Sequence, residues 1–310
     1  MSSPQTAPPP RWLANAILGA AVLIFSSSAI LVRHAQTEGV ASFAIAAWRM
    51  GLAAAVLLIL VAAQNARRSD AIAAPSMTSR EMWLGAAAGV FLAAHFASWI
   101  SSLAYTSVAS STALVTTNPI WIALFSFVVL REKLSRWLIA GVAAALCGSA
   151  LIFFADYSRA ATVASPNPLL GNSLALLGSL TVCGYLLIGR KLGRSSQPAP
   201  PLLQYLTVVY SASAVTLLLL CLGTGTALTG FSVGAWLCLA GLALGPQLLG
   251  HSAINWALRH VSATFVAVVI LGEPVASALL AWLFFGETFS TLQFCGFVVL
   301  LSGIYLASRE

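Results

Sequence analysis

Charged side chains are scarce in this 310-residue sequence: they make up 7% of the residues, whereas 59% are hydrophobic. Soluble domains carry about a quarter charged residues, so a water-soluble globule is excluded. The apolar runs are continuous and about 20 residues long, the length that a helix needs to cross the hydrocarbon layer. They lack the two-residue alternation of a membrane β-barrel. The sequence therefore predicts an all-α membrane protein.

Motifs of the common enzyme classes are also missing. The sequence contains no G-x-S-x-G, no H-E-x-x-H and no Walker A pattern, and its carboxylates form no cluster typical of a metal site. The five cysteines have no paired spacing, which argues against disulfides and metal ligands. We therefore expect no enzyme, no cofactor and no metal. An intramembrane hydrolase using serine and histidine stays open as an alternative, as does a structural membrane subunit.

Ten apolar segments are long enough to cross a membrane. They are 12–32, 40–63, 83–104, 108–130, 137–155, 169–189, 202–223, 232–257, 262–285 and 289–307. Residues 1–11 are polar and rich in proline, so we expect a disordered tail there. Residues 156–168 form an external linker between two five-helix halves, 12–155 and 169–307.

The net charge of +7 is spread over loops rather than gathered on one module. Twelve of the fifteen Lys and Arg residues fall on one side of the predicted membrane, while Arg33 and Arg159 fall on the other and Arg49 lies within a segment. This positive-inside pattern predicts an even number of crossings and both termini in the cytoplasm. A basic surface for nucleic acid would be clustered on a soluble module, so no nucleic-acid partner is expected.

Two stretches repeat each other: "TTNPIWIALFSFVVLREKLS" at 116–135 and "LGEPVASALLAWLFFGETFS" at 271–290. At an offset of 155 the matched pairs are Pro119 and Pro274, Glu132 and Glu287, Ser135 and Ser290, Gly141 and Gly296, and Gly148 and Gly303. At an offset of 156 they are Gly85 and Gly241, Gly89 and Gly245, and His95 and His251. A duplicated unit with an odd number of crossings enters the membrane from the opposite face, so we expect two inverted repeats around a central cavity.

These two stretches, each followed by a helix with two glycines, resemble the drug/metabolite transporter superfamily in its EamA-type branch. The length and layout are similar to the YddG-like exporters of aromatic amino acids. The resemblance implies that amino acids or related small amphipathic metabolites are exported from the cytoplasm by alternating access. The first copy carries Asn118 where the second carries Glu273, a departure that weakens any symmetric role for these positions.

Two charged residues lie deep within predicted crossings, where an unpaired charge costs about 2.5–3.5 kcal/mol on insertion scales. Arg49 and Glu273 lie at similar predicted depths, so we expect an ion pair or a shared water-filled cavity. One alternative is that the two residues merely pin helices together, and another is that burial keeps Glu273 neutral. The sharper hypothesis is that Arg49 binds a solute carboxylate or separates from Glu273 during transport.

Polar residues at four-residue spacing mark the eighth segment: Gln247, His251 and Asn255 share one face. His95 and Trp99 form the matching stripe of the third segment. Flat aromatic residues are expected to complete the wall of a cavity between the two halves. The predicted cavity wall consists of His95, Trp99, Asn118, Trp121, Tyr185, Gln247, His251, Asn255, Trp256 and Glu273. The histidines have an alternative role as hydrogen-bonded links between core helices.

Pro119 and Pro274 each remove a helix hydrogen bond and predict kinks. Arg49, Glu132 and Glu287 are candidates for charge pairing or gating, with end-capping as a further role of the two glutamates. The expected partners are a small-molecule solute and the lipid bilayer. Proton coupling stays open, and a monomer is expected, with a dimer as the alternative.

Overall fold

The computed structural model describes residues 11–66, 77–118, 120–122, 125, 135–157, 165–195, 200–257, 270, 272–307 and 309. Within these residues the chain is helical and contains no strand, which confirms the predicted all-α class. The helices are α1 (Arg11–Thr37), α2 (Ser42–Ala66), α3 (Ser79–Ser102), α4 (Val108–Val115), α6 (Arg136–Tyr157), α7 (Pro168–Ser195), α8 (Leu202–Thr224), α9 (Val233–Leu242), η1 (Ala243–His251), α10 (Ser252–Ala257), α12 (Gly272–Phe285) and α13 (Thr291–Ala307).

Six of the described helical stretches are long and apolar enough to cross a membrane. They are Ala16–Thr37, Ser42–Ala66, Ser79–Ser102, Pro168–Leu192, Leu202–Thr224 and Val233–Ala257. Shorter apolar helices cover Ile139–Ile152, Gly272–Phe285 and Thr291–Gly303. The count of ten crossings stays a prediction, because parts of the fourth and ninth predicted segments lie outside the described residues. The same is true of most of the predicted tail and of linker residues 158–164.

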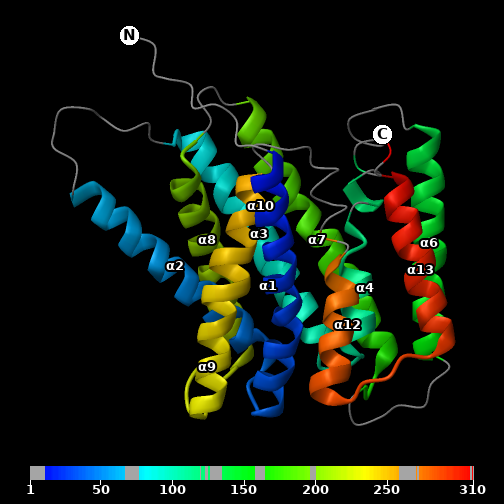
Figure 1. Ribbon diagram of the computed structural model, residues 1–310. Coiled ribbons are helices and arrows are strands. Elements are labelled where there is room, and N and C mark those ends of the chain that lie inside the picture. The colour runs from blue at the N-terminus through cyan, green and yellow to red at the C-terminus, as the bar shows by residue number, and fades with distance from the viewer. Residues whose placement is uncertain are drawn as a thin grey trace.

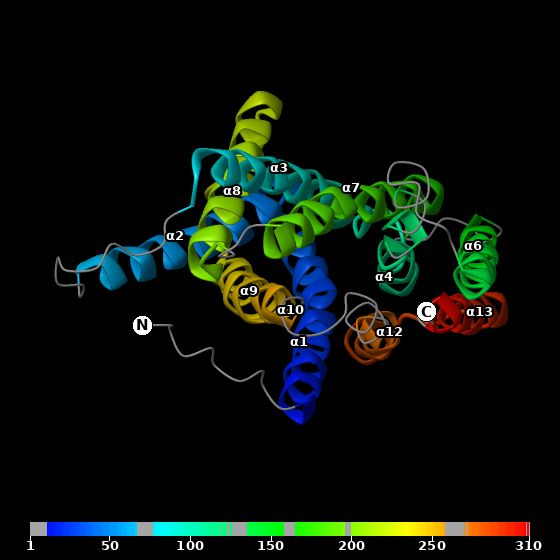
Figure 2. The same ribbon diagram turned by 90° about the horizontal axis from the view of Figure 1, so that it is seen from above.

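The long helices run side by side, and the first turn of α1 lies at the same end of the bundle as the last turn of α13 (Figure 1). Seen from above, α6 and α13 form a pair at one edge, next to α12 and α4 (Figure 2). Glycines allow the backbones of this pair to touch: a Cβ atom on Gly148 would overlap the backbone of Leu300, and one on Gly303 would overlap that of Ala145. Small residues are typical of such close contacts between membrane helices.

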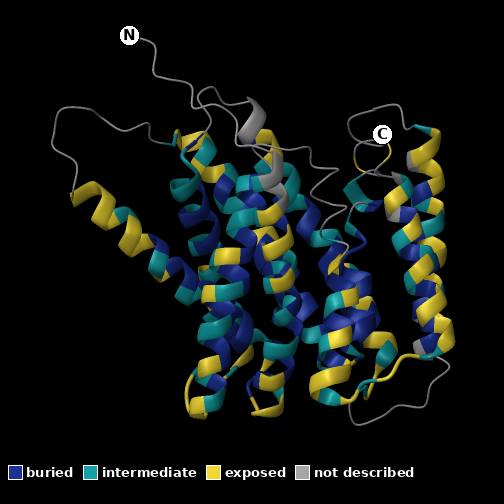
Figure 3. Cartoon of the chain, viewed as in Figure 1, coloured by how far each residue is buried: buried dark blue, intermediate teal, exposed yellow. Residues whose placement is uncertain are grey.

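Burial divides the bundle into an inner and an outer surface (Figure 3). Large apolar side chains such as Trp83, Leu219 and Phe284 are exposed on the outside, as expected where lipid tails cover a helix. The interior also holds many polar groups, and the largest fully buried side chain is that of Arg49. Polar groups at this depth are costly unless they are partnered or functional, so they direct attention to the interior.

Two predicted segments differ from the structure in ways that matter for function. The first, predicted to end at residue 32, continues as α1 to Thr37, so Arg33 is a helical residue and not part of a loop. The segment predicted as one helix over 232–257 contains the π-helix η1 with Pro246 inside it. A proline has no N–H and its ring clashes with the carbonyl one turn earlier, and a wider π turn accommodates such an interruption.

Candidate solute cavity

A cavity with a volume of about 80 Å³ lies among α1, α2, α3, α4, α7, η1 and α12. Its lining is mostly apolar with a few convergent polar groups, as is typical of small-molecule sites. Both halves of the chain contribute to its wall. The polar residues that line it are Ser28, Arg49, His95, Thr116, Asn118, Tyr185, His251 and Glu273.

Arg49 on α2 is completely buried. Its Nε donates to Gln247 Oε1 at 2.9 Å and its Nη1 donates to Ser28 Oγ at 2.8 Å. The guanidinium carbon also lies 4.1 Å from the centre of the Phe96 ring, a cation–π distance. All of these partners are neutral, and no ion pair of Arg49 is found among the described residues. The positive charge is therefore held in place without a contacting counterion.

Glu273 supplies the opposite charge from the first turn of α12. Its side chain lines the same cavity as Arg49, and the residue is 8% exposed. In the part of the chain that the structure describes, this carboxylate has no hydrogen-bond partner and no ion-pair partner. The cavity thus holds a buried guanidinium group and a buried carboxyl group that do not form an ion pair.

The two histidines face this space from opposite halves. His95 Nδ1 lies 2.9 Å from the carbonyl oxygen of Gly178, so this nitrogen carries the proton and donates. The His251 ring packs edge-on against Phe25, with 4.6 Å between ring centres, and against Phe96 at 5.5 Å. It has no hydrogen-bond partner among the described residues. Both imidazoles therefore keep a nitrogen available to a molecule in the cavity.

Gln247 and Asn255 lie one layer behind the wall. The side-chain Oε1 of Gln247 accepts the hydrogen bond from Arg49, and the backbone carbonyl of Gln247 accepts one from the Tyr210 hydroxyl at 3.3 Å. Asn255 Nδ2 donates to the Tyr185 hydroxyl at 2.5 Å and to the His251 carbonyl at 2.7 Å. These amides therefore position Arg49 and Tyr185 instead of facing the cavity.

Two predicted wall residues lie elsewhere. Trp121 lines a separate apolar pocket with α6 side chains such as Leu146 and Phe154. Asn118 and Trp121 are three residues apart, and only Asn118 lines the solute cavity. Trp256 packs in a small apolar cluster with Leu18, Phe25 and Ile254, because adjacent helix residues point in different directions.

The remaining candidates divide by whether the structure describes them. His95, Trp99, Asn118, Tyr185, His251 and Glu273 all line the cavity. Pro274 is buried in the first turn of α12, but the residue before this helix lies outside the described part, so its kink stays a prediction. Pro119 and Glu132 also lie outside the described residues. Glu287 lies at the far end of α12, away from the cavity wall.

Sequence reasoning missed the contribution of α1. Phe25 and Ser28 line the cavity from this helix, and Ser28 holds Arg49. The available signal was the run Ser26, Ser27 and Ser28 inside an apolar segment. Phe96 and Thr116 also line the cavity, but phenylalanines are common in the sequence and give no signal that marks a wall.

Comparison with known proteins identifies the class of molecule to which this cavity belongs. The sequence model of the EamA-like transporter family matches the chain twice, at residues 12–154 and 169–309. The uncharacterized transporter YyaM of Bacillus subtilis (strain 168) is 22% identical over 265 residues, which is 85% of this chain and 83% of that protein. An uncharacterized transporter of Archaeoglobus fulgidus is 30% identical over 78 residues, covering 25% of this chain and 29% of the relative. A solved crystal structure shares the fold with a TM-score of 0.66 and 18% identity, covering 96% of this chain and 98% of that one.

Proposed function

Since the chain belongs to the EamA-like transporter family, we propose that it exports amino acids, aromatic ones foremost, or related small amphipathic metabolites. The proposed setting is a bacterial-type inner membrane, with both termini in the cytoplasm and one solute bound in the central cavity. A transporter moves its solute without changing it, and family membership favours this over the hydrolase and the structural subunit considered from the sequence.

One observation carries the choice of solute: Arg49 and Glu273 bring opposite charges to one buried cavity without pairing with each other. An arginine binds a carboxylate through parallel N–H donors, and a carboxylate binds an ammonium group. The flat side chains of Phe96, Trp99 and Tyr185 line the same cavity and offer apolar contact to a ring. A zwitterion with an apolar or aromatic group satisfies all three features.

Alternating access is supported by the duplicated unit. The two family matches divide the chain into similar halves, and both halves supply cavity residues. We infer that the halves are inverted, so that exchange of their conformations opens the cavity to one face and then the other. In this arrangement His95 and His251 are corresponding positions, and so are Asn118 and Glu273.

The repeat-related serines Ser135 and Ser290 test the inversion. Each is replaced by cysteine, one at a time, in a protein whose five native cysteines have been replaced. A membrane-impermeant thiol reagent is then added to intact cells or to inside-out vesicles. Inverted repeats require that Ser290→Cys reacts from outside and Ser135→Cys from inside. Reaction of both from the same face contradicts the inversion.

Flux into proteoliposomes tests the function itself. The purified protein is reconstituted and offered a panel of radiolabelled amino acids, with empty liposomes as the control. We expect saturable flux that is greatest for aromatic members. An imposed pH gradient tests proton coupling, because coupled flux changes with the gradient and uncoupled flux does not. A protein that moves none of the panel contradicts the proposed solute class, and one that consumes a substrate without moving it favours the hydrolase.

A further inference from the structure

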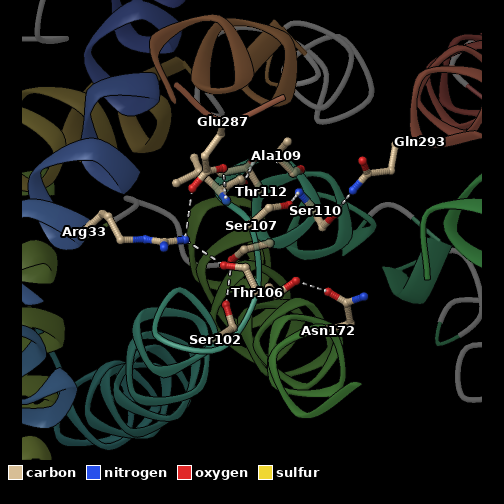
Figure 4. A network of polar contacts seen from close by, with 12 residues as sticks. Arg33, Ser102, Thr106, Ser107, Ala109, Ser110, Thr112, Asn172, Glu287 and Gln293 are labelled. Atoms are coloured by element: carbon tan, nitrogen blue, oxygen red, sulfur yellow. Dashed lines mark hydrogen bonds and ion pairs between the residues drawn. The ribbon is translucent and has the colours of Figure 1, made fainter. Parts of the chain in front are cut away.

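A second buried charge cluster (Figure 4) includes Arg33, which lies near the last turn of α1. Arg33 Nη2 on α1 lies 3.3 Å from Glu287 Oε1, and both side chains are 10% exposed. The same Nη2 donates to the carbonyl oxygen of Thr106 at 2.7 Å. Glu287 Oε2 accepts from the backbone N–H of Val108 at 2.9 Å. Three segments that are distant in sequence are thus joined at one point.

Local structure aims Glu287 at this point. Gly286 ends α12 with φ of 64°, a conformation that glycine adopts without strain, and the chain then runs toward α13 (Figure 1). The carboxylate reaches the first residue of α4, where the helix dipole and free N–H groups favour a negative charge. Ser107 caps the same helix by accepting from the N–H of Ser110 at 3.1 Å.

Both contacts of Glu287, with Arg33 and with Val108, cross between the two matched halves, while the hydrogen bond from Arg33 to Thr106 lies within the first half. Arg33, Thr106 and Val108 belong to the first half, while Glu287 belongs to the second. Two neighbouring hydrogen bonds also cross between the halves: Thr106 Oγ1 donates to Asn172 Oδ1 at 2.8 Å, and Gln293 Nε2 donates to Ser110 Oγ at 3.0 Å. We call the contacts of Arg33, Thr106 and Val108 with one another and with Glu287 the outer cluster, since the charge count places this end outside the cell.

The helices that meet at the outer cluster also line the cavity. On α1, Ser28 lines the cavity only five residues before Arg33, which is about 7.5 Å along a helix. On α4, Val115 lines it seven residues after Val108, about 10 Å further in. Glu273 lies in the first turn of α12, and Glu287 follows the last residue of this helix, Phe285, by two positions. The same three helices therefore wall the cavity and converge at the outer cluster.

We propose that the outer cluster is the external gate of the cavity, closed in this structure, and that the Arg33–Glu287 ion pair breaks each time solute leaves. This inference rests on the transport function proposed above. An alternating-access carrier needs contacts between its halves that form on one side and separate on the other. A buried ion pair gives such a contact two distinct states, because the pair is stable when closed and both charges are hydrated when open.

Sided labelling of the cavity tests the gate without measuring solute flux. In a protein without native cysteines, Val115→Cys serves as the reporter, and a charged, impermeant thiol reagent is added from outside to intact cells. Arg33→Gln combined with Glu287→Gln removes both charges and keeps similar shapes. We expect the labelling rate to rise at least tenfold. An unchanged rate in a folded double variant overturns the gate.

The matched control is Glu38→Gln. Glu38 also joins α1 to the second half at this end, since its Oε2 accepts from Ser232 Oγ at 2.7 Å, but this contact is exposed. Loss of its charge is expected to leave the labelling rate of Val115→Cys unchanged. A rise equal to that of the double variant would mean that any charge loss at this end loosens the bundle, and the specific role of the outer cluster would be wrong.

Cross-linking supplies an independent test if the double variant does not fold. Arg33→Cys and Glu287→Cys are joined by a bifunctional maleimide with a reducible spacer, and flux is measured before cross-linking, after it and after reduction. A gate predicts at least a tenfold loss that reduction reverses. Ser102→Cys with Ser111→Cys is the control, because these hydroxyls lie 2.6 Å apart within one half.

If uncross-linked protein moves solute and the cross-linked gate pair moves it equally well, the gate is wrong while the transport function stands. Absence of flux in every sample, wild type included, instead contradicts the transport function, and the labelling test then decides the gate.

Discussion

Arg33 and Arg49 are both buried in the same bundle, yet their surroundings differ in one respect. Arg33 lies against a carboxylate, that of Glu287, at 3.3 Å. Arg49 lies against an amide, a hydroxyl and an aromatic ring, all of them neutral. A membrane protein that needs only to hold helices together pairs its buried charges, because an unpaired one is costly. The difference indicates that Arg33 serves contact between the halves and that Arg49 serves a ligand.

Removal of Arg33 is expected to have the largest effect on stability. Arg33→Ala leaves Glu287 buried without its cation, and breaking a buried pair in this way costs about 3–5 kcal/mol. Unfolding of the purified protein in detergent measures the loss. The double variant Arg33→Met with Glu287→Met removes both charges, so it should recover much of the stability. Equal loss in single and double variants would contradict the paired state of Arg33.

Arg49→Gln is expected to have the largest effect on transport. A hydrogen bond to a charged group contributes about 1.5–3 kcal/mol, so loss of this cation should weaken carboxylate binding roughly 10- to 100-fold. Proteoliposome flux at several solute concentrations separates affinity from turnover. A glutamine at position 49 can still form a hydrogen bond to Gln247 or Ser28, so the free energy of unfolding should fall less than in Arg33→Ala. Unaltered solute dependence would remove Arg49 from the site and with it the contrast to Arg33.

The sequence predicted helix positions well, because length and hydropathy alone select a crossing. The segment predicted at 202–223 is α8, Leu202–Thr224, and the one at 137–155 is α6, Arg136–Tyr157. Helix ends were less predictable where the helical hydrogen bonds continue beyond the end of the apolar run. At the end of α1 the apolar run stops before Arg33, while the helix continues to Thr37. Because the sequence placed Arg33 in a loop, it did not predict the ion pair with Glu287.

The candidate site was predictable only where a residue type is unusual in its setting. His95, His251 and Glu273 stand out as polar residues in apolar segments, and all three line the cavity. Aromatic residues gave a weaker signal, since they serve lipid contact, packing and binding alike. Trp99 lines the cavity but Trp121 does not. The direction of a tryptophan depends on its place around the helix and on the neighbouring helices, which composition does not reveal.

Glu273→Gln should have a smaller effect than Arg49→Gln and a different selectivity. The variant keeps the shape of the side chain but loses its charge, which is expected to weaken the binding of an amino acid roughly tenfold, within the range for a charged hydrogen bond. A matched solute that lacks the amino group should bind to the variant and the wild type alike. Competition of both solutes against labelled flux measures this. Equal loss for the two solutes would mean that Glu273 acts on the structure and not on the ammonium group.

Tyr185→Phe is expected to produce the smallest change, and it tests whether the neutral layer behind the wall matters. The ring that lines the cavity stays, while the hydroxyl that accepts from Asn255 is lost. A neutral hydrogen bond contributes about 1 kcal/mol, and Asn255 keeps its second acceptor, the His251 carbonyl. The stability should therefore fall by about 1 kcal/mol, with flux reduced less than in Glu273→Gln. Asn255→Leu removes the same bond from the other side together with the bond to the His251 carbonyl, so adding Tyr185→Phe to Asn255→Leu should change the stability little further. A combined effect equal to the sum would show that Tyr185 and Asn255 act separately, and that neutral contacts hold this wall less firmly than the ion pair holds the outer cluster.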